Sequence, residues 1–179
     1  MKRSLGIAVV VGAVVWACGD PLQNARVAAL GDERAGVSPG PGHRPGQPCL
    51  ACHGGSGPAD VDFSVAGTIY QTAAADSPPL AGATVTIFDA TQLADGGVPH
   101  TATTNAAGNF FVRQEEWSPT FPLHDIAVSG AGIATPTVMH TVVGRDGSCA
   151  TCHFDPRGRD SHGHVYLVVD PADLPGAAP

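Results

Sequence analysis

Lysine is nearly absent from this chain of 179 residues, whose only lysine is Lys2. Lys2 and Arg3 belong to an N-terminal segment that we expect to be removed. The remainder carries seven arginines against all 16 acidic residues, which gives a formal charge of −9. Such a surface repels nucleic acid and anionic lipid, and it excludes docking through a ring of lysines. We therefore expect no nucleic-acid partner, and we expect partner proteins with basic docking surfaces.

Long apolar runs are also missing. The run from Leu5 to Ala17 has 13 residues, whereas a membrane-spanning helix needs about 20. Because a basic N-terminus precedes it, the run has the pattern of a secretory signal peptide over residues 1–17. Its end, Val15 to Cys18, resembles the lipobox of bacterial lipoproteins, in which the cysteine receives diacylglycerol. The resemblance implies lipidation of Cys18 and anchoring at the bacterial outer membrane, on its periplasmic or cell-surface face. An ordinary signal peptide with Cys18 as an unmodified thiol is the alternative.

Catalytic motifs and helical periodicity are lacking as well. No spacing of Ser, His, Asp or Glu singles out a nucleophile, a general base or a phosphate-binding loop. No convincing helical stretch follows residue 18, and this excludes an all-helical fold. We predict no catalytic residues and a protein that is not an enzyme, with a peroxidase-like activity as the alternative left open.

Cysteine, by contrast, occurs in an informative pattern. The chain has five cysteines, an odd number for an exported protein, and four of them form two copies of Cys-x-x-Cys-His. Two thiols at this spacing add across the two vinyl groups of one porphyrin, and the adjacent imidazole becomes the proximal iron ligand. The motifs predict two c-type haems, with attachment at Cys49, Cys52, Cys149 and Cys152 and with His53 and His153 as the iron ligands.

These observations predict a membrane-anchored dihaem c-type cytochrome that transfers single electrons outside the cytoplasm. Two alternatives stay open. The four cysteines could form a structural zinc site, although the gap between Cys52 and Cys149 is far longer than the spacing in zinc ribbons. A small haem peroxidase or sensor would keep an open coordination position on one iron.

The second axial ligand of each iron has to come from the remaining histidines or from the only methionine after Met1. His43 precedes the first motif in a Gly- and Pro-rich arm, and His162 and His164 follow the second motif in a Gly-containing loop. Met139 and His140 lie in a predicted strand. These five residues are the candidates for the distal position. His100 and His124 are more typical of surface or core histidines.

The rest of the chain alternates with the period of β-strands. Residues 18–48 have no apolar period and are rich in Gly and Pro, which predicts a flexible tether. Seven short strands separated by turn residues then predict an all-β antiparallel sandwich. The predicted strands are Phe63–Tyr70, Ala83–Phe88, Thr101–Thr104, Asn109–Arg113, His124–Ser129, Val138–Val143 and Val165–Val169.

Part of this stretch resembles a known family. Val65-Ala-Gly-Thr-Ile-Tyr70, Pro79 to Asp89 and Thr103 to Phe111 are similar to the carboxypeptidase regulatory-like domain, a transthyretin-like Greek-key β-sandwich. The resemblance covers roughly residues 63–145 and implies a scaffold without catalytic residues. We expect Gly108 to take the positive φ of a tight turn, and Gly82 to relieve crowding where a strand begins.

The expected organisation places the two haem motifs at the edges of the sandwich. If the first strand and Val138–Val143 were antiparallel neighbours, both haems would lie at the same end of the domain. The expected segments are a lipoprotein signal peptide (1–17), a tether (18–48), a first haem-binding loop (49–62), the sandwich (63–145), a second haem-binding loop (146–163), a last strand (164–170) and a disordered tail (171–179).

Overall fold

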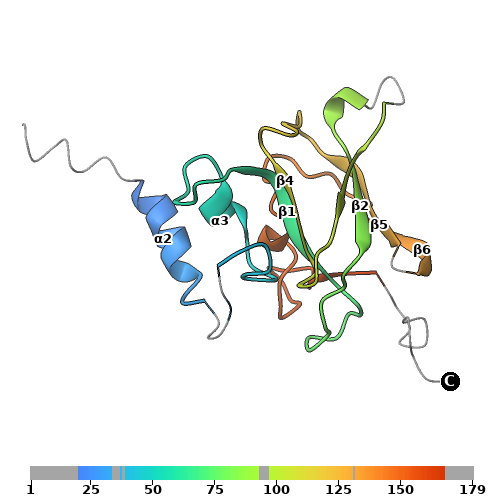
Figure 1. The fold of residues 1–179 in the computed structure, drawn as a ribbon, viewed down its shortest axis with the longest axis horizontal. Helices are drawn as coiled ribbons and strands as arrows, with labels where there is room; N and C mark the ends of the chain where they lie inside the picture. The colour runs from blue at the N-terminus through green and yellow to red at the C-terminus, as the bar shows by residue number, and fades with distance from the viewer. Residues whose placement is uncertain (1–19, 34–36, 38, 93–96, 131, 168–179) are drawn as a thin grey trace, which may run out of the picture. The chain divides into compact units, whose positions relative to one another are not determined.

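The computed structural model describes residues 20–33, 37, 39–92, 97–130 and 132–167 (Figure 1). The chain divides into two units, Met1–Gly31 and Asp32–Pro179, which we describe separately. The predicted signal peptide, Cys18 and the predicted tail lie outside the described residues. Within the described residues, no helix has both the length and the apolar character that a membrane span requires.

The first unit contains a helix, α2 (Pro21–Ala29), where no helical stretch was predicted. Asp20 caps it, because its carboxylate accepts hydrogen bonds from the backbone of Leu22 at 2.9 Å and of Gln23 at 3.1 Å. Pro21 suits the first helical turn, where its missing N–H removes no helical hydrogen bond. The expectation of a uniformly flexible tether is therefore wrong here, because the Gly and Pro residues of the tether lie mainly after residue 35.

The second unit is built from two β-sheets, consistent with the predicted β-sandwich-like architecture (Figure 1). The first sheet has the order β4-β1-β7 and the second has the order β3-β2-β5-β6. The strands are β1 (Phe63–Tyr70), β2 (Ala83–Phe88), β3 (His100–Thr103), β4 (Asn109–Arg113), β5 (His124–Gly130), β6 (Ile133–Val138) and β7 (Val165–Tyr166). A 3-10 turn, η1 (Ala90–Gln92), follows β2.

The hydrophobic core lies between the sheets and follows from the alternation of apolar residues. In β2 the side chains of Ala83, Val85 and Ile87 are buried, and those between them are half-buried. The core also contains Val65, Ile69, Phe110, Val112, Leu123, Ile126, Val128 and Leu167. Burying each large aliphatic or aromatic side chain contributes about 1.5–3 kcal/mol, so this cluster holds the two sheets together.

Strand β1 differs from the expected strand with one buried face. Ala66 and Thr68 alternate with the core residues of β1, yet both are buried. The segment that precedes the first motif contacts Thr68, because the Gly46 N–H donates a hydrogen bond of 2.8 Å to the Thr68 hydroxyl. Ala66 is contacted instead by the segment that leads into the second motif, since its N–H donates to the Gly147 carbonyl at 3.0 Å and it pairs with Ser148. The chain before Cys49 is thus docked on β1, which corrects the prediction that the tether extends as a flexible segment to residue 48.

Two predicted strands differ in position or direction. The strand predicted at Val138–Val143 is wrong, because β6 ends at Val138. Pro136 breaks the apolar alternation of the true strand, but β6 is an edge strand, where a residue without an N–H is tolerated. Strand β7 pairs with β1 in parallel, an exception to the predicted antiparallel arrangement. The predicted extension of this last strand to Val169 lies partly outside the described residues.

Of the two glycine predictions, the one for Gly108 is confirmed and the one for Gly82 is wrong in its reason. Gly108 has a φ of +70° in the turn before β4, as predicted. Gly82 also has a positive φ, of +73°, and an added Cβ there would meet nothing within 4 Å. Its role is therefore backbone conformation before β2, not the relief of crowding.

Candidate functional site

The first Cys-x-x-Cys-His motif forms a single helical turn. Cys49 is the N-cap of α3 (Leu50–His53), and its carbonyl accepts hydrogen bonds from Cys52 N at 3.1 Å and from His53 N at 2.9 Å. Residues three and four positions apart lie on one side of a helical turn. The turn therefore presents the two thiols and the imidazole of this motif together, which is the arrangement that attachment to one porphyrin requires.

The His53 ring is held by one hydrogen bond and by aromatic stacking. Its Nδ1 lies 2.8 Å from the carbonyl oxygen of Val61. Because a carbonyl oxygen only accepts, Nδ1 carries the proton and Nε2 keeps a lone pair for a metal. The ring stacks on Phe63 at a centroid distance of 4.3 Å, and Phe63 stacks on Phe111 at 4.8 Å. These contacts fix the imidazole before any ligand binds.

The second motif begins as a 3-10 turn, η2 (Cys149–Thr151), and is seated on β1. The Asp146 carboxylate accepts hydrogen bonds from the Ser148 backbone at 2.8 Å and from the Thr151 hydroxyl at 2.9 Å. The Gly147 carbonyl accepts a hydrogen bond of 3.0 Å from the backbone N–H of Ala66, and Ser148 pairs with Ala66 as a parallel bridge. This motif therefore extends the edge of β1 that β7 also occupies.

The His153 ring repeats the arrangement of His53. Its Nδ1 lies 3.0 Å from the carbonyl oxygen of Gly163, so the same tautomer leaves Nε2 free for a metal. Burial lowers the pKa of His153, which favours the neutral ring that metals bind. The loop between the two residues is organised by the Ser161 hydroxyl, which accepts hydrogen bonds from Phe154 N at 2.9 Å and Gly163 N at 3.0 Å.

The two acceptor carbonyls occupy equivalent places in the fold. Val61 lies two residues before β1, and Gly163 lies two residues before β7. Strands β1 and β7 are parallel neighbours, with Ile69 opposite Val165. The chain thus contains the same unit twice: a Cys-x-x-Cys-His turn, a loop, a carbonyl that fixes the histidine, and a strand.

The two motifs also approach each other at β1. A Cβ on Gly67 would lie 2.9 Å from the Cys149 Cβ and 3.1 Å from its sulfur, so Cys149 packs directly against the backbone of β1. Burial raises the pKa of Cys149 to about 12, and the nearby Cys49 thiol adds to the rise. Burial likewise raises the pKa of Cys49 to about 11. All four motif cysteines are free thiols.

The two motifs lie close together for a different reason from the strand pairing that we expected. The expected antiparallel pairing of β1 with a strand at Val138–Val143 is absent, because β6 belongs to the other sheet. The motifs meet because α3 and η2 both pack against β1. In the part of the chain that the structure describes, no three His, Cys, Asp or Glu side chains converge as a set that could hold a metal ion. The four cysteines therefore do not form a ready tetrahedral zinc site.

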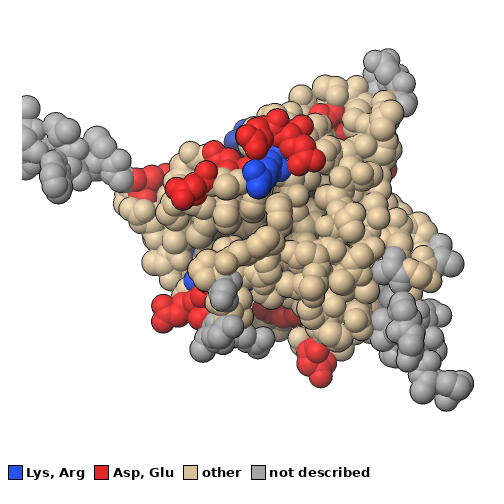
Figure 2. Space-filling model, viewed as in Figure 1, with Lys and Arg blue, Asp and Glu red and all other residues tan. Residues whose placement is uncertain are grey.

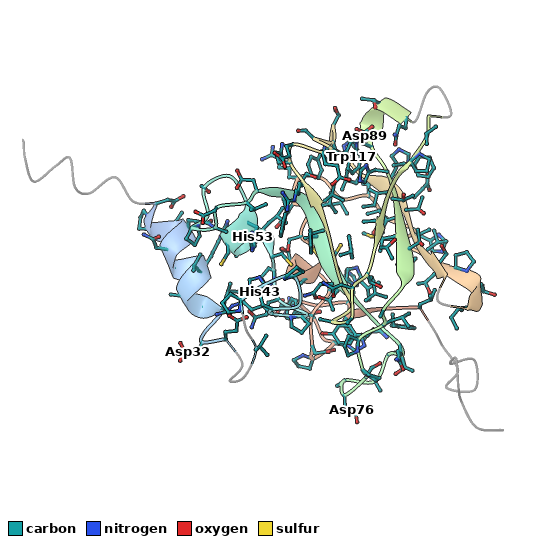
Figure 3. The ribbon with its side chains drawn as sticks, in the orientation of Figure 1. Asp32, His43, His53, Asp76, Asp89 and Trp117 are labelled. Carbon is teal, nitrogen blue, oxygen red and sulfur yellow. The ribbon has the colours of Figure 1, made fainter. Side chains whose placement is uncertain are left out.

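The structure distinguishes among the five candidates for the distal position. The ring of His43 lies 5.8 Å from that of His53, and the ring of His162 lies 5.6 Å from that of His153. Figure 3 shows His43 and His53 on neighbouring segments of the second unit. His164, in contrast, uses both nitrogens, with Nδ1 2.5 Å from Asp155 and Nε2 2.7 Å from the Thr72 carbonyl.

The remaining candidates do not lie at either motif. Met139 and His140 follow β6 in the other sheet; Met139 packs against the hydrophobic core and His140 is exposed. The structure therefore brings His43 and His162 to the motifs. It does not bring Met139, His140 or a free nitrogen of His164.

A buried polar network at the opposite sheet was not singled out from the sequence. His124 donates from Nδ1 to Asp125 at 2.8 Å, and its Nε2 lies 2.9 Å from the Asp89 carbonyl oxygen. The hydrogen bond to Asp125 raises the pKa of His124. Burial opposes ionisation of Asp89, but hydrogen bonds from Thr91 and Thr120 hold its pKa below the usual value. These contacts are structural and bear out the view of His124 as a core histidine.

His100 is likewise engaged in packing. Its ring stacks on Trp117 with a centroid distance of 4.7 Å and an interplanar angle of 5°. Its Nε2 lies 3.7 Å from the Glu116 carboxylate. Trp117 lies in the loop after β4 and packs against the core.

Comparisons of the chain with protein-family models, with curated proteins and with solved structures gave no match.

Proposed function

We propose that this protein is a dihaem c-type cytochrome that carries single electrons outside the cytoplasm. The observation that supports it best is the repeated unit at β1. Both Cys-x-x-Cys-His motifs form a tight turn with free thiols, and in both the histidine donates from Nδ1 to a backbone carbonyl. If the cysteine pairs bound zinc or formed disulfides, the histidine that follows each pair would not need the same orientation in both motifs.

The donor set fits the chemistry of haem attachment. Each motif thiol would add across a vinyl double bond of the haem, with sulfur bonding to one carbon and the thiol hydrogen to the other, so that a thioether would form without any oxidant. His53 and His153 would hold the iron through Nε2, and their Nδ1 hydrogen bonds fix the ring orientation and increase the basicity of the ring. Bound haem supplies iron that changes between the ferric and ferrous states.

The β-sandwich acts in this proposal as a rigid support. The resemblance to the carboxypeptidase regulatory-like domain gives it the same role, since that Greek-key domain is a scaffold. Because both motifs pack on β1, the same strand holds both attachment sites. Electron transfer benefits from such an arrangement, since the protein around the iron then needs little rearrangement when the charge changes.

The setting of the protein follows from its N-terminus and its charge. We infer export, lipid attachment at Cys18 and anchoring at the bacterial outer membrane, on its periplasmic or cell-surface face. Figure 2 shows acidic side chains gathered on the drawn face with few basic ones among them. A redox partner that meets this surface should therefore be basic, and its binding should weaken as salt increases.

The experiment is to produce the protein in a bacterium that matures c-type cytochromes and to measure its haem content. Absorption of the pyridine derivative and the intact mass should both give two haems for each chain. The double variant Cys49→Ser/Cys52→Ser and the double variant Cys149→Ser/Cys152→Ser should each retain one haem. A purified protein with no haem absorption, or one that contains stoichiometric zinc instead, would exclude the proposal.

A further inference from the structure

We infer that both irons are six-coordinate with two histidines each, His43 completing the site of His53 and His162 completing that of His153. This inference rests on the proposed function and assigns the ligands that decide how the haems react. Among the histidines in the described part of the chain, only these two lie in ring contact with a motif histidine.

The segment that carries His43 is anchored to the sandwich. The side-chain amide of Asn109 donates to the carbonyl of His43 at 2.9 Å and to that of Pro41 at 3.3 Å. Gly46, on the other side of His43, donates to the Thr68 hydroxyl. The backbone on both sides of His43 is therefore fixed on β1 and β4, although the composition of the segment indicated a flexible arm.

The orientation of the His43 ring suits a metal ligand. Its Nδ1 lies 3.5 Å from Oε1 of Glu33, and this buried oxygen has no hydrogen-bond partner in the described residues. A carboxylate beside Nδ1 is a common neighbour of a ligating histidine, and with Glu33 on the Nδ1 side, Nε2 is the nitrogen left for the metal. The side chain of His43 is about one third exposed, at 32%.

His162 is placed by the same residues that fix His153. Its backbone N–H donates 3.0 Å to the carbonyl of Cys152, inside the motif. The next residue, Gly163, has a φ of +78° and provides the carbonyl that accepts from His153 Nδ1. Residues 162 and 163 thus fix the proximal ring through a carbonyl and place a second, exposed imidazole beside it.

The distances between the rings agree with shared ligation. Imidazole–metal bonds of roughly 2 Å put two ring centres on one ion about 6 Å apart. The observed centroid distances are 5.8 Å for His43 and His53 and 5.6 Å for His153 and His162. His164 is excluded because both of its nitrogens are hydrogen-bonded.

The chemical consequence is that neither iron has an open coordination position. Two imidazole ligands keep the haem in the low-spin state and at low potential, and they prevent the binding of peroxide or of a diatomic gas. The inference therefore assigns electron transfer to both haems and removes the peroxidase and sensor alternatives.

The test uses the purified dihaem protein and reads spin state and carbon monoxide binding. The wild-type protein should give two low-spin ferric signals in electron paramagnetic resonance, and after reduction it should bind no carbon monoxide. His43→Ala and His162→Ala should each convert one of the two haems to high spin, with carbon monoxide then binding to half of the haem. Added imidazole should restore the low-spin state.

Two further variants make the result specific. His140→Ala removes an exposed histidine of the other sheet and should leave both signals unchanged. His43→Met supplies a thioether in place of an imidazole, so it should stay low-spin while the potential of one haem rises. If two haems are attached and their spin states do not change in His43→Ala and His162→Ala, this inference is overturned, but the cytochrome proposal stays intact. A protein without haem would overturn the proposal itself.

Discussion

Gly147 lies two residues before the second motif and directly against the backbone of β1, and an added methyl group there should push the two apart. A Cβ at this position would lie 2.0 Å from the carbonyl oxygen of Ser64 and 3.1 Å from the Cα of Val65. Both atoms belong to the backbone, so no side chain can move aside. The Gly147→Ala variant must therefore shift the motif away from β1.

The cost can be worked out from two contributions. Overpacking against a fixed neighbour costs about 1–3 kcal/mol, and loss of the hydrogen bond from Ala66 N to the Gly147 carbonyl costs about 0.5–1.5 kcal/mol. We expect Gly147→Ala to lower the free energy of unfolding by about 2–4 kcal/mol. For a chain of this size each kcal/mol corresponds to about 2–4 °C in Tm.

The assay is urea unfolding of the haem-free protein, followed by circular dichroism. Gly144→Ala is the matched control, since a Cβ there meets nothing within 4 Å and its φ is not in the left-handed region. This control should unfold within about 0.5 kcal/mol of the wild type. If Gly147→Ala were as stable as Gly144→Ala, the second motif could not be seated on β1 as described.

Two further predictions concern the first motif and the polar network. Gly57→Ala would place a Cβ 2.0 Å from the Cys52 carbonyl oxygen, whereas Gly55→Ala meets nothing within 4 Å; thermal unfolding should show a loss of about 1–3 kcal/mol in the first variant only. The hydrogen bond to Asp125 raises the pKa of His124. Its contribution to stability is therefore complete below about pH 6.5, the ordinary pKa of histidine in the unfolded chain, and is lost as the pH rises through the raised pKa of the folded state. Urea unfolding between pH 6 and 9 should therefore show a smaller loss of stability in Asp125→Asn than in the wild type, and equal slopes would contradict this reasoning.

Local patterns were sufficient for much of the sandwich. The alternation of Ala83, Val85 and Ile87 determines which face of β2 is buried, and such a pattern requires no knowledge of distant residues. The α2 helix has only nine residues and is followed directly by a Gly- and Pro-rich stretch, so the composition of residues 18–48 as a whole does not predict a helix. Strand β6 was missed because Pro136 is acceptable only at an edge, and the strand order that makes β6 an edge is a property of the whole fold.

The candidate site shows the same division between local and tertiary information. The motif spacing indicates both proximal histidines, since attachment depends on residues that are adjacent in the chain. It does not distinguish His162 from His164, which are two positions apart. That distinction comes from Asp155 and Thr72, which occupy both nitrogens of His164, and Thr72 is distant in the sequence.

The two carbonyls that orient the motif histidines also imply an order of assembly. The acceptor of His53 is Val61, which lies two residues before β1, and β1 pairs with β4 as far as Arg113. The acceptor of His153 is Gly163, and its position depends on β7, near the end of the described residues. A chain that is delivered from its N-terminus therefore presents the residues of its first site before those of the second.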